Sequence, residues 1–89
     1  MSEEKNTLEE LVEGLSRERD ELRVKLQLAK QEIRDQWEPL EDKWSSLETR
    51  MRSLGDATSE AGKDVIAASR LLLDEIGDAY KEIWKEIRR

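Results

Sequence analysis

Apolar residues recur at steps of three and four through the first half of the chain, and this spacing restricts that half to a long amphipathic helix. The seam consists of Leu8, Val12, Leu15, Leu22, Leu26, Ala29, Ile33, Trp37, Leu40, Trp44, Leu47, Met51 and Leu54. Arg19 places a charge in one position of the seam. Two successive steps of four, at Ala29, Ile33 and Trp37, form a stutter, which locally unwinds a coiled coil. The pattern predicts a first helical arm over about residues 7–54.

Local signals mark the ends and the middle of this arm. Thr7 and Glu10 have the spacing of a capping box, and Gly55 follows the last seam residue, where a left-handed glycine commonly ends a helix. Pro39 lies inside the arm, and an interior proline costs about 3 kcal/mol. Because the seam stays in phase through Pro39, we expect the helix to kink and continue rather than to break at Glu38 and restart.

A second seam predicts a second arm over about residues 58–88. Its members are Ala61, Val65, Ala68, Leu72, Ile76, Ala79, Ile83 and Ile87. Antiparallel pairing about Asp56 sets Leu40 against Leu72 and Trp44 against Ala68, and it leaves residues 55–57 as a short turn. We therefore predict an all-α fold, a single domain over residues 1–89 that forms an antiparallel two-helix coiled-coil hairpin. One continuous helix in a parallel coiled coil is the alternative, which Gly55, Thr58, Ser59 and Gly62 disfavour.

A hairpin with arms of unequal length leaves apolar surface uncovered. The second arm ends opposite residue 23, so the N-terminal leucines lack a partner, and the second arm carries an additional apolar stripe. The resulting candidate interaction surface consists of Leu8, Leu11, Val12, Leu15, Leu22, Ile66, Leu73, Tyr80 and Trp84. We expect these residues to drive a two-fold homodimer with a four-helix arrangement.

The composition argues against catalysis and nucleic-acid binding. The chain has no His and no Cys, so it lacks the usual general base, the thiol nucleophile and the strongest transition-metal ligands. Charged residues make up 43% of the chain, but the net charge is −6 and no segment is a basic stripe. We expect no enzyme activity, no catalytic residue and no bound cofactor, metal or nucleic acid.

The same sequence predicts a cytoplasmic protein. The absence of Cys fits a reducing compartment, and the acidic N-terminal segment lacks the apolar region of a signal peptide. The longest apolar run, Leu71–Leu73, is far shorter than a membrane span. A membrane location is therefore not expected.

The three tryptophans have two interpretations each. Trp37 and Trp44 lie one heptad apart on the first seam, where core packing is the simpler interpretation and a ligand groove opened by the Pro39 kink is the alternative. Trp84 lies off the main seam near the basic residues Lys81 and Lys85, where it could anchor a dimer contact, a protein partner or a membrane interface.

The segments Lys25–Ala29 and Asp35–Trp44 precede a turn rich in Gly, Ser and Ala and a second amphipathic helix. This arrangement resembles a group of short bacterial coiled-coil proteins, some of which are described as stress-response proteins of unknown molecular function. The resemblance implies a bacterial helical hairpin and supplies no active site. Pro39 departs from the uninterrupted helical pattern of that group.

Two functional hypotheses follow from the sequence. The first is a non-catalytic oligomeric coiled-coil scaffold or protein-interaction module, a homodimer that also accepts a protein partner. The alternative is reversible binding of lipid or another hydrophobic surface, for which the hairpin would open and expose its apolar faces. The net negative charge opposes binding to anionic membranes.

Overall fold

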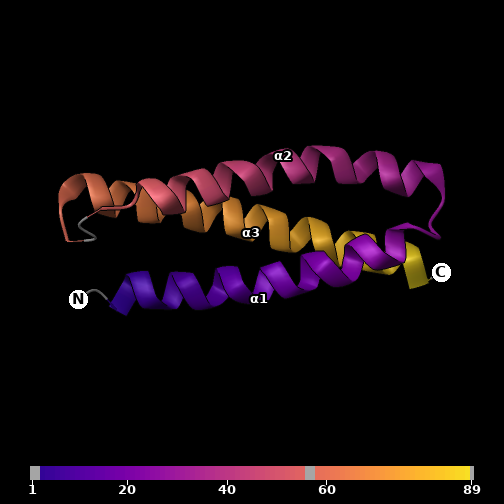
Figure 1. Cartoon of the computed structure of the whole chain (residues 1–89), viewed down its shortest axis with the longest axis horizontal. Helices are drawn as coiled ribbons and strands as arrows, with labels where there is room; N and C mark the ends of the chain where they lie inside the picture. Colours follow the sequence, from indigo (N-terminus) through magenta and orange to yellow (C-terminus); the bar gives the residue numbers. More distant parts are fainter. Residues whose placement is uncertain (1–2, 56–57, 89) are drawn as a thin grey trace.

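The computed structural model describes residues 3–55 and 58–88, which form an all-α bundle of three helices without a strand (Figure 1). The helices are α1 (Glu3–Leu26), α2 (Gln31–Ser53) and α3 (Glu60–Arg88). α1 and α3 run in the same direction and α2 runs against both, so the two chain ends lie at opposite ends of the rod (Figure 1). The bundle measures 45 × 19 × 16 Å.

The first arm is two helices rather than one, and the predicted two-helix hairpin is therefore wrong. The predicted helix over residues 7–54 is interrupted between Leu26 and Gln31. Its start was also misplaced, because α1 already includes Glu3 and Thr7 lies inside the helix instead of capping it. The second arm was close to its prediction of 58–88, since α3 covers Glu60–Arg88.

The connection between α1 and α2 is a tight turn that uses no glycine or proline. The backbone N–H groups of Gln27, Leu28 and Ala29 donate to carbonyls three residues earlier, at 3.1–3.3 Å, which tightens the end of α1. Arg34 then closes the turn from the side of α2. Its Nε donates to the Leu26 carbonyl at 3.0 Å and its Nη2 to the Gln27 carbonyl at 2.6 Å, so one cation binds the last carbonyl of α1 and the first carbonyl of the turn.

Burial explains why the chain turns at this place. A helix continued through residues 27–30 would carry Leu8, Leu15 and Leu22 away from α3, whereas the turn buries all three in the core. A fully buried leucine contributes about 1.5–3 kcal/mol, and an ordinary residue loses less than about 1 kcal/mol when it leaves a helix. Folding back is therefore favoured, and the stutter at Ala29 and Ile33 lies at the point where the helix ends.

The helix continues through Pro39, as predicted, because α2 extends from Gln31 to Ser53 with Pro39 inside it. The end of α2 differs from the prediction. Leu54 is extended (φ −70°, ψ 109°), and none of the glycines in the described ranges has a positive φ, so Gly55 is not a left-handed cap. Of the predicted turn over residues 55–57, positions 56 and 57 lie outside the described residues.

α3 lies between the other two helices and supplies the centre of the core. It packs closely along both α1 and α2, whereas α1 and α2 approach each other only marginally. Its buried residues are Gly62, Ile66, Ser69, Leu73, Ile76, Tyr80 and Ile83. The additional apolar stripe of the second arm is therefore the part of α3 that allows a third helix to pack against it. Ala61, which antiparallel pairing about Asp56 would set against Met51, is exposed.

The start of α3 is fixed by Ser59. Its Oγ accepts a hydrogen bond from the Gly62 N–H at 3.0 Å, and its carbonyl accepts one from the Lys63 N–H at 2.9 Å. This is the geometry of a serine N-cap, which satisfies a backbone donor that the first helical turn leaves unpaired.

Candidate interaction site

Most of the predicted interaction surface lies inside the chain. Six of its nine residues are buried, with exposed fractions from 0% to 8%: Leu8, Leu15, Leu22, Ile66, Leu73 and Tyr80. Val12 and Trp84 are half-buried against the same core, and Leu11 is 41% exposed. The folded molecule therefore uses these residues to join α1 to α3, and the interpretation that they form a free apolar surface is corrected. The leftover surface that motivated a four-helix dimer is covered within one chain.

The least closely packed junction of the bundle is the one between α1 and α2, where one ion pair bridges the two helices. Arg19 of α1 donates from Nε to Oε1 of Glu41 at 3.0 Å and from Nη2 to Oε2 at 2.6 Å. The guanidinium also lies over the Trp44 ring, 5.5 Å from its centroid. The hydrogen bonds that Arg19 donates to the Glu41 carboxylate raise the pKa of Arg19 above its ordinary value. This bidentate contact fixes both the distance between the two side chains and their relative orientation.

Two hollows lie along this junction, one on each side of the Arg19–Glu41 pair. The basic hollow, of about 570 Å³, is lined by Arg23, Leu26, Gln27, Arg34, Trp37 and Glu41. The acidic hollow, of about 370 Å³, is lined by Glu9, Val12, Glu13, Ser16, Trp44, Glu48, Met51 and Arg52. We refer to the two hollows and the ion pair between them as the α1–α2 groove.

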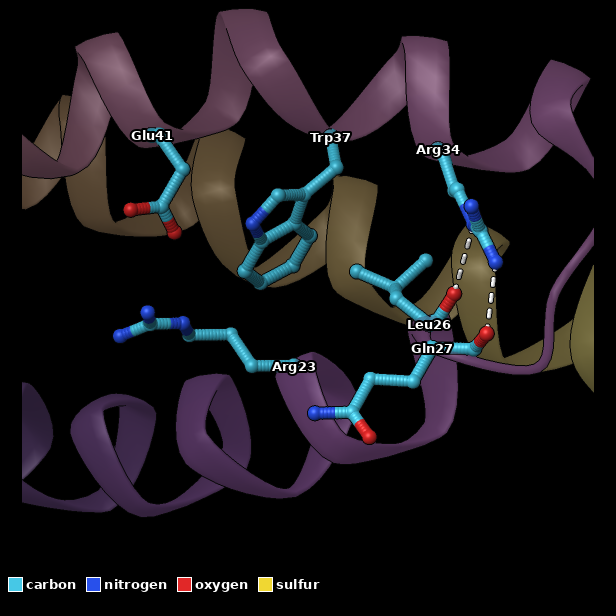
Figure 2. Close-up of a pocket in the computed structure, with 6 residues that line it drawn as sticks. All are labelled: Arg23, Leu26, Gln27, Arg34, Trp37 and Glu41. Carbon is cyan, nitrogen blue, oxygen red and sulfur yellow. Dashed lines mark hydrogen bonds between the residues drawn. The ribbon is translucent and has the colours of Figure 1, made fainter.

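Aromatic rings form part of the groove and connect it to the core. Trp37 reaches from α2 toward α1 at the basic hollow, and Arg23 lies along the α1 side (Figure 2). Trp37 stacks on Tyr80 of α3, with ring centroids 5.3 Å apart and an interplanar angle of 20°. The predicted register had placed Trp37 near Ile76, one helical turn earlier on α3. Trp37 therefore both packs against the core and lines the groove.

Tyr80 is the most constrained polar group beneath the groove. Its side chain is fully buried, and its hydroxyl has no hydrogen-bond partner within the described parts of the chain. Burial raises the pKa of the Tyr80 hydroxyl well above its ordinary value, while the nearby Arg19 cation acts in the opposite direction. The hydroxyl therefore stays protonated throughout the physiological pH range.

Trp84 lies in a different place, in a hollow between α1 and α3 with Glu18 and Glu21 across from it. The Arg88 guanidinium covers its ring at 5.5 Å from the centroid. The large apolar side chains that are more than half exposed are Val24, Leu28 and Leu71, and none of them belongs to the lining of either groove hollow.

Arg19, Glu41 and Arg34 of the groove were not identified as site residues from the sequence. Arg19 had a signal, since a charge in an apolar seam needs a partner, but the long helix offered it none. Glu41 resembled the other solvated carboxylates, because its contact with Arg19 exists only after α1 folds back on α2. Arg34 had no sequence signal either, because its role depends on the turn between Leu26 and Gln31, which the sequence pattern did not predict.

The described residues contain no group of three or more His, Cys, Asp or Glu side chains arranged to hold a metal ion. Within the same ranges, none of the helices is both long and apolar enough to cross a membrane. Comparison with known proteins found no matching family model, no matching curated protein and no matching solved structure.

Proposed function

We propose that this chain is a non-catalytic protein-interaction module that presents the α1–α2 groove to another helical surface. The observation that carries the proposal is the unequal packing of the bundle. α3 packs closely along both other helices, but α1 and α2 are joined mainly by long side chains across a groove with two hollows. A further helical surface laid against this groove would complete the packing on the side where the bundle is incomplete.

The residue types of the groove support binding. Trp and Arg are the residues that most often dominate the energy of protein interfaces, and the groove presents the half-buried Trp37 and the exposed Arg23, whereas Trp44 is 3% exposed and belongs to the core. Trp37 is held by its stacking on Tyr80, so its ring is oriented before a partner arrives. Preformed anchors lose little side-chain entropy on binding.

Lipid binding has no comparable support. That hypothesis depended on an apolar face of the second arm too wide for one neighbouring helix, and in the bundle α3 buries this face against both α1 and α2. The absence of Cys from the sequence fits a module that works in the reducing cytoplasm.

Site-specific photo-crosslinking tests the proposal. A benzophenone side chain would replace Glu9 at the acidic end or Gln27 at the basic end, both exposed groove residues, or Arg70, an exposed residue of α3. Full-length chain would be irradiated in the cells that produce it, and adducts would be identified by mass. We expect discrete adducts from both groove positions and none from Arg70. Groove positions that give no adduct, or only the adducts that Arg70 gives, would overturn the proposal.

A further inference from the structure

The two ends of the α1–α2 groove carry opposite charge. Glu9, Glu13 and Glu48 line the acidic hollow, where Arg52 is the one cation of the lining. Arg23 and Arg34 line the basic hollow, where Glu41 is the one anion and is already paired with Arg19. The groove is therefore negative at one end, neutral at the central ion pair and positive at the other end.

This distribution distinguishes between the two ways in which two copies can meet groove to groove. A two-fold axis along the rod would bring each acidic hollow against the acidic hollow of the second copy, which is repulsive. A two-fold axis across the rod, at the level of Arg19 and Glu41, reverses the second copy and sets each acidic hollow against a basic one. Only the second arrangement is self-complementary, as a two-fold interface must be.

The spacing of the charges agrees with the crosswise axis. Arg34 and Glu48 lie seven residues before and after Glu41 on α2, about 10 Å along the helix in each direction. On α1, Arg23 and Glu13 lie about 6 Å and 9 Å on either side of Arg19. An axis at the Arg19–Glu41 level therefore brings Arg34 level with Glu48 of the second copy.

The broad side of the rod extends 45 by 19 Å, so a second copy laid along it can span both hollows. Asp20 and Glu38 are exposed acids on the same two helices, outside the hollow linings. Together with the exposed Glu21 and Asp35, they lower the positive potential of the basic end, so the contrast rests on the charges that line the hollows themselves.

We infer that a second copy of this chain covers the groove in a two-fold dimer, with α1 antiparallel to α1 and α2 antiparallel to α2. The inference rests on the proposed function and assigns the partner of the same groove. In this dimer Arg23 of each copy lies opposite Glu13 of the other. Both residues are exposed, and neither makes an ion pair within the described residues, so each is available for an intermolecular contact.

A charge exchange between two chains tests the arrangement. R23E places an acid at the basic end and E13K a base at the acidic end, so in each homodimer residues 13 and 23 of the two copies would carry like charge and repel. We expect each to weaken self-association at least tenfold in sedimentation equilibrium. Mixing the two variants should restore association as a heterodimer, and the double variant E13K/R23E should restore the homodimer. Both recoveries should diminish with added salt, because exposed pairs are screened.

Matched controls separate geometry from net charge. R70E and D64K make the same charge changes at exposed positions of α3 and should leave association unchanged. Helical circular dichroism of every variant should match that of the parent chain. A parent chain that stays monomeric to about 1 mM, or variants that fail to recover on mixing, would overturn the dimer. Groove crosslinks to a different protein would then leave the proposed function standing, whereas absence of groove crosslinks would remove both.

Discussion

Gly77 of α3 lies against the Leu15 side chain of α1. A Cβ atom added to Gly77 would lie 3.9 Å from Cδ2 of Leu15, an ordinary van der Waals distance. Glycine is therefore not required by space at this position, although it lowers the stability of the helix around it.

Replacing Gly77 with alanine should stabilise the bundle. Alanine is favoured over glycine in a helix interior by about 1 kcal/mol, and the new methyl group fits beside Leu15. G14A is the companion variant, because nothing lies within 4 Å of a Cβ at Gly14. G77L should destabilise the protein through collision with Leu15, whereas G14L should not. Urea unfolding measures all four, and a neutral G77L would contradict the contact between α1 and α3.

Removing a buried leucine from α1 should cost much more than removing an exposed one from the turn. Leu22 is 0% exposed and Leu28 is 94% exposed. L22A should lower the free energy of unfolding by about 2–5 kcal/mol through lost burial and a cavity, and L28A should change it by less than about 0.5 kcal/mol. Equal effects would indicate that α1 does not return to α3, because both leucines would then lie on an extended first arm.

Replacing the buried Ser69 with alanine should stabilise the protein. Its side chain is 0% exposed, and its Oγ has no hydrogen-bond partner among the described residues, so the hydroxyl was desolvated without compensation. S69A should stabilise the protein by about 1 kcal/mol. S46A, at an exposed position of α2, gives the part of that gain due to helix propensity alone. A gain at Ser69 no larger than at Ser46 would show that the hydroxyl is satisfied in solution.

Because the Tyr80 hydroxyl is buried, we predict that the protein loses stability at alkaline pH. Burial raises the pKa of its hydroxyl, so the folded state keeps the proton at a pH where the unfolded state, with a pKa of about 10, has released it. The unfolded state then binds fewer protons, and stability falls as pH rises above about 10. Y80F should remove this component, which thermal unfolding between pH 8 and pH 11 measures. An unchanged alkaline slope in Y80F would assign the effect to other groups.

The Arg19–Glu41 pair should show coupling in a double-mutant cycle. The two side chains are 19% and 33% exposed, so solvent screens the contact in part. With R19M, E41Q and the double variant, we expect a coupling energy of about 1 kcal/mol, above that of a fully exposed pair. The more exposed pair Lys43–Glu75, at 3.1 Å between α2 and α3, is the reference and should couple more weakly.

The sequence predicted the helices of the second half better than those of the first. The passage of α2 through Pro39 was predicted from the phase of the seam, and the extent of α3 from its apolar seam, both of which are local signals. The turn between Leu26 and Gln31 has no glycine or proline. It is fixed by Arg34 and by burial of Leu22, which are contacts between positions that only the folded chain brings together.

The candidate site was less accessible from sequence for the same reason. Six of the nine apolar residues that the hairpin left without a partner are buried within the chain, whereas the sequence pattern assigned their covering element to another molecule. The wide face of α3, with Ile66, Leu73 and Tyr80, and the N-terminal leucines were treated as two separate surpluses. When two segments of one chain each carry uncovered apolar surface, packing the segments against each other buries both surfaces. The loss is a few helical residues at the turn.

The parallel arrangement of α1 and α3 sets an order of assembly for the chain. α2 and α3 are neighbours in sequence and can associate through a short loop. α1 is separated from α3 by the whole of α2, so their association closes a longer loop. Closing the longer loop costs more entropy, so α1 should dock last during folding and detach first during unfolding. Amide protons of α1 should then exchange with solvent before those of α3. Each such opening would briefly uncover the face around Ile66, Leu73 and Tyr80, which makes the docking of one helix the step that protects this protein from aggregation.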